Sequence, residues 1–212
     1  MTEAQQRHYG GRSAEDRRAE RRERLMAAGL ELFGTEGYSA ISIERLCSAA
    51  SVSTRNFYEE FPSRESLLIA LHDRVLDNAL RAVVAAAEET GRDATTLIRI
   101  TALIKAYVGT TASDPRWARL SYVEIIGVSP AVEQHRMAWR RRWWALIEAE
   151  AARAVERGEA KPRDFHLTAV AFIGAVNELV HYWSVCGAQR PLSEVTDELL
   201  RLAITSLTAD RG

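Results

Sequence analysis

The chain has few of the residues that mark secreted or membrane proteins. Only two cysteines occur among its 212 residues, Cys47 and Cys186, and two distant cysteines do not make a disulfide framework. The N-terminus is polar and charged, unlike a signal peptide. The longest apolar run, Ala169 to Val176, is far short of the ~18 residues that a membrane span needs. These absences predict a cytoplasmic protein with reduced thiols and no membrane partner.

Lysine and an excess of positive charge are also missing. The chain holds 26 arginines and two lysines, and its net charge is −1. Residues 1–66 hold ten arginines against eleven acidic residues, so the charge balance of this segment does not favour nucleic acid. Local clustering is the exception, because six arginines gather near the N-terminus: Arg12, Arg17, Arg18, Arg21, Arg22 and Arg24.

Motifs for catalysis and metal binding are absent as well. The five histidines have no HExxH or comparable spacing, and the chain has neither a glycine-rich phosphate loop nor a nucleophile elbow. His181 and Cys186 lie five residues apart on one expected helix, which is poor metal geometry without further ligands. The sequence therefore predicts no enzyme, no metal site and no cofactor.

Helical periodicity is present along most of the chain, without an alternating strand pattern. Capping serines, Asp-Pro and Ser-Pro pairs and glycines divide the pattern into segments. The result is an all-α chain of about nine helices, expected over residues 14–35, 42–50, 53–61, 63–90, 93–111, 114 onward, 129–158, 164–187 and 191–207.

The stretch from Ser42 to Phe61 predicts two short helices joined by a tight turn. Ser42 and Ser53 stand where a hydroxyl caps the first free N–H groups of each helix. Phe57 and Phe61 are four residues apart and face inward. The inner face of the first helix is formed by Ile43, Leu46, Cys47 and Ala50. The outward face of the second is formed by Thr54, Arg55, Asn56 and Tyr58.

Such an outward face has the chemistry to bind DNA. Arginine pairs with guanine O6 and N7, and asparagine with adenine N6 and N7, both through two hydrogen bonds. The alternative is an ordinary corner of two helices with a solvated polar face, because short helix–turn–helix patterns are common.

The flanking segments favour DNA binding. The run LFGTEGY precedes the stretch and FPSRESLL follows it. This order resembles the N-terminal domain of the tetracycline-repressor (TetR) family of regulators over about 50 residues, from near Arg21 to Leu71. The resemblance implies a three-helix DNA-binding domain with a helix–turn–helix, followed by a C-terminal helical bundle for ligand binding and dimerisation. We expect a flexible arginine-bearing arm over 1–17, the DNA-binding domain over 18–66 with its motif at about 42–61, and the bundle over 67–212.

The resemblance also implies the DNA contacts. Tyr38 stands where the family often contacts phosphate, although its ring can simply pack on the first helix. Arg64 lies in the first turn of a helix, where a cation opposes the dipole, so a phosphate partner is expected. Two departures from the family are Ser51 in place of a turn glycine and the acidic pair Glu59-Glu60, which we expect to face solvent. The predicted DNA-binding residues are Tyr38, Ser42, Ser53, Thr54, Arg55, Asn56, Tyr58 and Arg64.

In the C-terminal part, the helix expected over 164–187 is apolar nearly all round, which predicts burial on every side. A chain of this size does not easily surround such a helix alone, so a second copy is expected to cover it. TetR-type proteins dimerise through their last two helices. The predicted interface residues are Ala171, Gly174, Ala175, Val195, Leu199 and Leu202.

All five tryptophans lie outside the expected DNA-binding domain, which favours an aromatic-lined ligand pocket inside the bundle. Ordinary core packing is the alternative for each of them. The predicted pocket residues are Tyr107, Trp117, Tyr122, Trp139, Trp143, Asn177 and His181. The arginines at 140–142 do not predict a second nucleic-acid site, because consecutive helical residues point ~100° apart.

The sequence thus predicts a homodimeric transcriptional repressor released from a palindromic double-stranded DNA operator by a small, largely apolar effector. The alternative is an all-helical ligand-binding or dimerisation module whose N-terminal corner binds protein rather than DNA.

Overall fold

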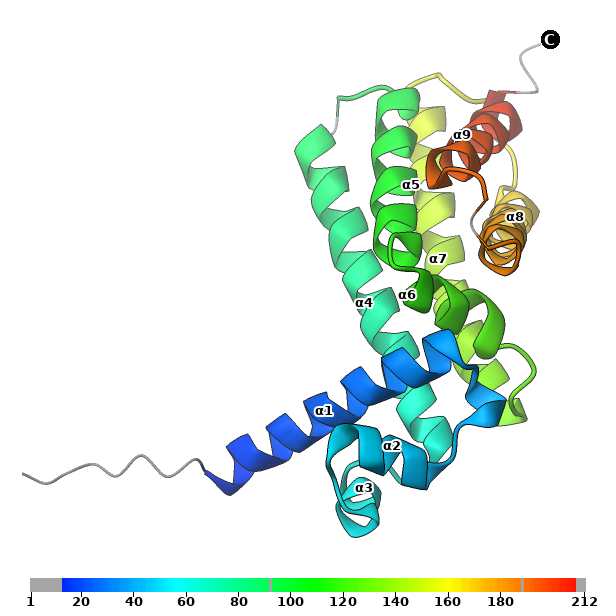
Figure 1. The fold of residues 1–212 in the computed structure, drawn as a ribbon. Coiled ribbons are helices and arrows are strands. Elements are labelled where there is room, and N and C mark those ends of the chain that lie inside the picture. Colours follow the sequence, from blue (N-terminus) through cyan, green and yellow to red (C-terminus); the bar gives the residue numbers. More distant parts are fainter. Residues whose placement is uncertain (1–12, 92, 188, 209–212) are drawn as a thin grey trace, which may run out of the picture.

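The computed structural model describes residues 13–91, 93–187 and 189–208, which form helices with short connections (Figure 1). In these ranges lie nine α-helices, a 3-10 turn η1 and a π-helical turn η2, so the predicted all-α class is confirmed. A flexible arm was expected over residues 1–17. Its first twelve residues lie outside the described ranges. Residues 14–17 already belong to the first helix, so that part of the expectation is wrong.

α1 (Ala14–Thr35) has the predicted bounds and begins with a capping box between Ser13 and Asp16. We expected Gly37 to close it as a left-handed cap. Instead the helix ends on Glu36 in a right-handed conformation, and Gly37 follows with φ 97° and ψ 145°. That backbone strongly favours glycine, and it turns the chain into η1 (Tyr38–Ala40).

α2 (Ile43–Ala50) and α3 (Thr54–Glu60) form the predicted pair of short helices. The Ser42 hydroxyl accepts from the Arg45 N–H, and the Ser53 hydroxyl accepts from the Asn56 N–H. Both serines thus satisfy donors that have no partner inside their helix, as the sequence predicts.

α4 (Arg64–Thr90) begins at the predicted Ser63 cap and spans roughly 40 Å at 1.5 Å per residue. It joins the two halves of the molecule (Figure 1). Leu67, Leu68 and Leu71 in its first turns pack into the N-terminal core, whereas Val75 and Val83 pack into the C-terminal one. The physical division between the halves therefore falls inside α4, after the boundary at residue 66.

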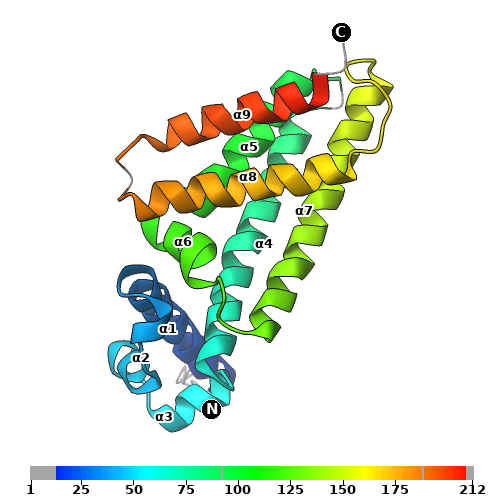
Figure 2. The ribbon, with the colours of Figure 1, turned by 90° about the vertical axis from the view of Figure 1, so that its right-hand side faces the viewer.

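The C-terminal half contains α5 (Thr96–Ala112), α6 (Pro115–Arg119), η2 (Leu120–Glu124), α7 (Pro130–Glu156), α8 (His166–Val185) and α9 (Leu192–Thr208). Asp114 and Ser129 cap α6 and α7 ahead of their prolines, as predicted. α5 begins three residues later than expected because Thr95 caps it. Figure 2 shows α8 and α9 side by side on an outer face, crossing the long helices α4, α5 and α7.

The core of the N-terminal half includes residues from the C-terminal half. Leu120 and Ile125, from η2 and the residue after it, and Val132 of α7 are buried in the same cluster as Leu25 and Phe33 of α1. The two halves are thus packed together along η2, α1 and α4. Across the described ranges, no helix combines the length and apolar character needed to cross a bilayer.

Candidate DNA-binding surface and ligand cavity

The turn between α2 and α3 fixes the direction of the second helix. Ser51 adopts the left-handed conformation, with φ 52° and ψ 48°, at the position where a glycine is common. Its N–H donates to Ser48 O, and the Val52 N–H donates to Cys47 O at 2.9 Å. These bonds close the end of α2 and compensate for the ~1 kcal/mol that a non-glycine residue loses there.

α3 divides its residues into a buried and an exposed face, as the sequence predicts. Phe57 and the following Phe61 are fully buried against α1 and α2. Arg55 and Thr54 are exposed, Tyr58 is 54% exposed, and Asn56 is half-buried. The exposed groups lie at the N-terminal end of a two-turn helix whose other side is held by the core. A helix so held keeps Arg55 exposed to solvent in a fixed position.

Glu60 corrects the expectation that both acids at the end of α3 face solvent. Glu59 is exposed, but Glu60 is only 8% exposed. Its carboxylate forms ion pairs with Arg18 at 3.2 Å and Arg21 at 3.3 Å, and its carbonyl accepts from Arg22 at 3.0 Å. The arginines of α1 thus hold the end of α3 and neutralise the acid beside the surface that would face DNA.

Arg64 has a structural role that the sequence does not reveal. Its guanidinium lies 4.3 Å from the centre of the Tyr38 ring and donates to the Ile41 carbonyl. The Tyr38 ring also packs edge-on against Phe33 at 5.2 Å. The half-buried Arg64 and Tyr38 therefore brace the segment that leads into α2.

A polar contact joins η2 to the end of α1. The Glu124 carboxylate accepts from the Tyr38 N–H at 2.7 Å and pairs with Arg119 at 2.8 Å. Arg119 also donates to Thr35 O at 2.6 Å. Nearby, a Cβ added to Gly34 would lie 2.6 Å from the Arg116 Cβ, so α1 and α6 approach as closely as only glycine permits. This contact connects the DNA-binding half with the bundle.

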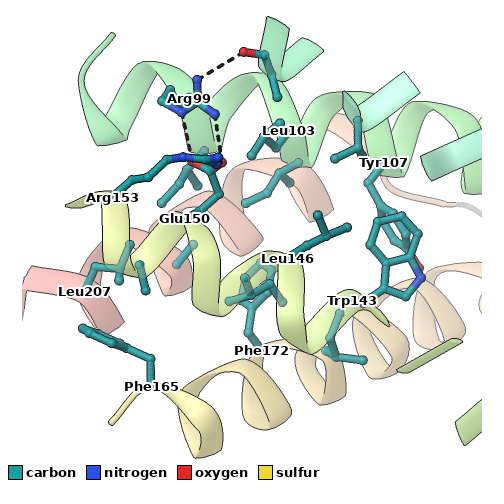
Figure 3. Close-up of a pocket in the computed structure, with 18 of the residues that line it drawn as sticks. Arg99, Leu103, Tyr107, Trp143, Leu146, Glu150, Arg153, Phe165, Phe172 and Leu207 are labelled. Carbon is teal, nitrogen blue, oxygen red and sulfur yellow. Dashed lines mark hydrogen bonds and ion pairs between the residues drawn. The ribbon is translucent and has the colours of Figure 1, made fainter. Parts of the chain in front are cut away.

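The bundle encloses a cavity of about 590 Å³ between α4, α5, α7, α8 and α9 (Figure 3). This volume is within the range of small-molecule sites in proteins. Apolar side chains form most of the wall: Val83, Ile100, Leu103, Ile104, Tyr107, Trp143, Leu146, Ile147, Phe165, Phe172, Ile173 and Leu207. The cavity favours a ligand with a large apolar part.

One end of the cavity carries a charged pair that sequence reasoning missed. The Arg99 guanidinium meets the Glu150 carboxylate through two hydrogen bonds of 2.8 and 2.9 Å, and it donates to Gly91 O at 2.6 Å. Burial opposes ionisation of Glu150, but the bonds from Arg99 hold the pKa of this carboxyl below its ordinary value. The sequence around Arg99 gives little indication of this ion pair, because Arg99 is a single charge in the apolar run TLIRITALI.

The predicted pocket residues separate into three groups. Tyr107 and Trp143 line the large cavity. Tyr122, Trp139 and Asn177 line a second, much smaller cavity beside it. Neither wall includes the remaining two, Trp117 and His181.

Packing explains why these two side chains are used elsewhere. Trp117 packs against the apolar clusters on both sides of α6. The His181 Nδ1 lies 2.7 Å from Tyr122 O and fixes η2 against α8.

The sequence comparisons decide the family. Residues 25–71 match the family described as "Bacterial regulatory proteins, tetR family". Residues 93–207, more than half of the chain, match the family described as "Tetracyclin repressor-like, C-terminal domain". The chain belongs to the TetR family. It is therefore a DNA-binding transcriptional regulator and not an enzyme, which removes the alternative of a purely protein-binding module.

Curated relatives include the HTH-type transcriptional regulator EthR of two mycobacteria. EthR of Mycobacterium tuberculosis is 27% identical over 205 residues, covering 93% of this chain and 92% of EthR. EthR of Mycolicibacterium smegmatis is 28% identical over 151 residues, covering 71% of this chain and 68% of EthR.

Solved structures of the same fold include two regulators named FadR. FadR of Bacillus halodurans superposes with a TM-score of 0.76 at 16% identity, covering 88% of this chain and 96% of FadR. FadR of Bacillus subtilis, solved with stearoyl-CoA, has a TM-score of 0.75 at 18% identity, covering 86% and 97%. At these identities the structures establish the fold and not the ligand.

In this TetR-family chain, α8 and α9 leave an apolar face uncovered. Leu167 is 77% exposed, Tyr182 and Val185 are each 56% exposed, and Ala171 and Gly174 are also exposed. These residues recur at helical spacing along one face of α8, which also carries the exposed Glu178 between Gly174 and Tyr182.

Not every predicted interface residue belongs to this face. Leu202 is exposed on α9, and Ala175 and Val195 are half-buried. Leu199 is 0% exposed within the single chain, where it packs against α5, so its assignment as an interface contact is wrong.

Proposed function

We propose that this TetR-family regulator is a homodimeric repressor of a palindromic operator, released when a small, largely apolar ligand enters the bundle. The observation that carries this proposal is a short hydrogen-bonded path between the cavity and the DNA-binding half. Tyr107 lines the cavity, and its hydroxyl lies 3.3 Å from the Tyr122 hydroxyl in η2. Glu124, at the end of η2, accepts from the Tyr38 N–H.

A ligand shifts the conformational population only if it binds one state better than another. A ligand that displaces Tyr107 moves η2, and η2 contacts both α1 and α4. Two DNA-binding halves that change their separation then no longer fit successive major grooves. This is how we expect occupancy of the cavity to reduce operator affinity.

For DNA recognition, we propose that Arg55 and Asn56 read base edges, aided by Ser53 and Thr54. Phosphates are contacted by side chains around α3: Tyr38, Ser42, Tyr58 and Arg64. The operator is first selected from random double-stranded DNA. Arg55→Ala is then expected to cost about 1–3 kcal/mol on the selected site and to relax the sequence preference. Equal losses on selected and random DNA would contradict base readout by Arg55.

Arg64→Ala is expected to weaken binding to every sequence and to lower the slope of log affinity against log salt by about 1. Because Arg64 also braces Tyr38, the melting temperature of the Arg64→Ala variant is measured beside that of the wild type. Arg201→Ala, an exposed change on α9, is the control and leaves the slope unchanged. An unchanged slope for Arg64→Ala would leave Arg64 with its structural role alone.

The apolar nature of the ligand is tested by filling the cavity. Leu103 lines the wall, so Leu103→Trp occupies the volume and is expected to abolish binding of 1-decanol while retaining operator binding. Leu97→Trp lies on the exposed side of the same helix and serves as the matched control. Decanol binding that persists in Leu103→Trp would place the ligand elsewhere.

The dimer is proposed to form through the uncovered face of α8 and α9. Nothing lies within 4 Å of a Cβ built on Gly174, so the helix has room there for a close neighbour. Gly174→Glu is expected to split the dimer in sedimentation experiments and to reduce operator binding with it. In the dimer, half-sites are expected ~34–36 Å apart or a multiple of that distance. A compact wild-type monomer at micromolar concentration would contradict this interface.

A further inference from the structure

The second, smaller cavity is chemically unlike the large one. It has a volume of about 30 Å³, enough for roughly two waters or one carboxylate. Polar side chains dominate its wall: His72, Tyr107, Ser121, Arg136, Arg140 and Asn177. A cavity this small does not hold a ligand by itself, but it has the size of a polar head group.

The two cavities are neighbours along the same helices. Tyr107 lines both. On α7, the wall continues by one turn from Trp143 to Trp139 and Arg140, and on α8 it continues from Ile173 to Asn177. Figure 3 shows Tyr107 and Trp143 at the end of the large cavity opposite Arg99 and Glu150. The small cavity therefore lies beside the end of the large one that is farther from the Arg99–Glu150 pair, with Tyr107 in the wall of both.

Three polar groups at this junction have no partner among the described residues. Arg140 is half-buried and forms no hydrogen bond or ion pair within those ranges, and Glu133 is the acid whose charge acts on it. Likewise, across the described chain, the buried Ser121 Oγ and Trp143 Nε1 have no hydrogen-bond partner. Of these three, the Ser121 Oγ and the Trp143 Nε1 are buried, and an unsatisfied buried polar group costs about 1–3 kcal/mol, so two of them close together favour a bound polar group.

The other cations near the cavities are already used. Arg99 is satisfied by Glu150 and backbone carbonyls, and Arg136 is paired with Glu133. Burial, with a further contribution from the charge of Arg136, lowers the pKa of the Arg140 guanidinium. A cation without an anionic partner is the group that a ligand carboxylate would satisfy.

We propose that the small cavity is an anion site that holds the carboxylate of an amphiphilic effector whose apolar chain fills the large cavity. Arg140 supplies the charge, and Ser121 and the Tyr107 hydroxyl are the hydrogen-bonding groups beside it. The apolar half of this inference rests on the proposed function, whereas the anion site rests on the unpaired groups. The volume accepts a carboxylate and excludes a bulky nucleotide head group.

The test compares decanoate with 1-decanol and methyl decanoate on the full chain, by calorimetry and tryptophan emission. All three carry a ten-carbon chain, and only decanoate carries a charge. The wild type is expected to bind decanoate about tenfold or more tighter than the alcohol, because hydrogen bonds to charged groups are the stronger ones. Arg140→Gln is expected to remove this preference while changing decanol affinity less than about twofold.

Arg141→Gln is the matched control, since Arg141 is exposed one residue away on the same helix. Both ligands should bind it as they bind the wild type. Ser121→Ala keeps the test valid if Arg140→Gln does not fold. It removes an unsatisfied hydroxyl, so the free protein should be no less stable, while decanoate binding falls about threefold and decanol binding does not.

The outcomes separate the two proposals. Equal affinity for decanoate and decanol in the wild type overturns the anion site and leaves the apolar cavity standing. A preference that survives in both Arg140→Gln and Ser121→Ala overturns the assignment of these residues. Binding of none of the three ligands overturns the anion site and the apolar ligand together.

Discussion

In the N-terminal half, the aromatic residues Phe33, Phe57 and Phe61 are fully enclosed by their own chain. In the C-terminal half, Tyr107 and Trp143 instead form the wall of a cavity of about 590 Å³. The DNA-binding half thus uses its apolar residues to fix a short helix in place. The bundle leaves part of its apolar surface unpacked.

This difference follows from what each half must do. The helix proposed to read base edges has only seven residues, which is too short to be stable without tertiary packing. A ligand site needs the opposite, an apolar volume that the chain itself does not fill. The exposed Leu167 shows the same property of the bundle, since its apolar side chain is not covered within the single chain.

The largest expected effect comes from opening the closed core. Phe57→Ala should destabilise the fold by about 3–5 kcal/mol, because it removes a fully buried ring and leaves a void. Phe172→Ala, in the half-buried wall of the large cavity, should cost roughly half as much or less. Urea unfolding of both variants measures the difference, and equal losses would mean that the two halves are packed alike.

A second prediction concerns the one buried ion pair of the cavity wall. Glu150→Gln leaves the Arg99 guanidinium buried without a counter-charge and should cost about 3–5 kcal/mol. Glu198→Gln, in an exposed pair with Arg201, should cost less than about 0.5 kcal/mol. If the two substitutions have similar effects in thermal unfolding, the pair at the cavity end is effectively solvated.

The same pair gives a dependence on pH. The pKa of Glu150 is lowered from 4.5, so its stabilising contribution is complete above pH 4.5 and is lost as the pH falls through the lowered value. The difference in unfolding free energy between wild type and Glu150→Gln should therefore shrink on acidification.

A third prediction tests the contact between the halves with two glycines. Gly34→Ala places a methyl group 2.8 Å from the Arg116 Cα and should cost about 1–3 kcal/mol by pushing α6 from α1. Gly174→Ala has open space and should be neutral or stabilise the single chain by up to about 1 kcal/mol. Denaturant midpoints measured at concentrations where the wild type is monomeric compare the two. A tolerated Gly34→Ala would show that the halves are loosely coupled.

The last prediction concerns the pH dependence that His72 contributes, a histidine buried where α4 meets α7. Burial, then the neighbouring His135 and Arg136, lower its pKa from 6.5 to about 3. The unfolded chain therefore binds a proton that the folded chain excludes, and stability should fall as the pH drops below 6.5. The loss is about 1.4 kcal/mol per pH unit for this one proton, continuing to about pH 3.

His72→Gln should reduce this slope by about one proton. His135, 2.9 Å away with a pKa that burial also lowers, and the nearby Asp73 are retained in both proteins. Unfolding free energies between pH 4 and 7 provide the measurement, and an unchanged slope would show that His72 titrates normally in the folded state.

The helix starts were predictable because their causes are local. Ser42, Ser53 and Ser63 each accept a hydrogen bond from an N–H three residues further on, so a short window of sequence contains the whole interaction. The inward positions Phe57 and Phe61 follow from helical spacing in the same way. The family resemblance, carried by residues between Arg21 and Leu71, was also visible in the chain itself and is confirmed.

The roles of single polar residues were not predictable, because their partners are distant in sequence. Glu60 faces the arginines of α1 about 40 positions earlier, and Arg99 faces Glu150 after 51 positions. Leu199 has the apolar character of an interface residue, yet packing against α5 hides it inside one chain. Neither composition nor spacing tells a buried side chain from an exposed one here, since the same residue type occurs in both environments.

By itself, then, the sequence determined an all-helical chain, the position of the helix–turn–helix and the side chains that α3 turns outward, because caps and periodicity act over a few residues. Tertiary structure alone decided which aromatic residues enclose a cavity and which fill the core. It also decided that the Ser121 Oγ is buried without a hydrogen-bond partner among the described residues. A cavity is the space left by helices from four or five separate segments, and its shape depends on how all of them pack at once.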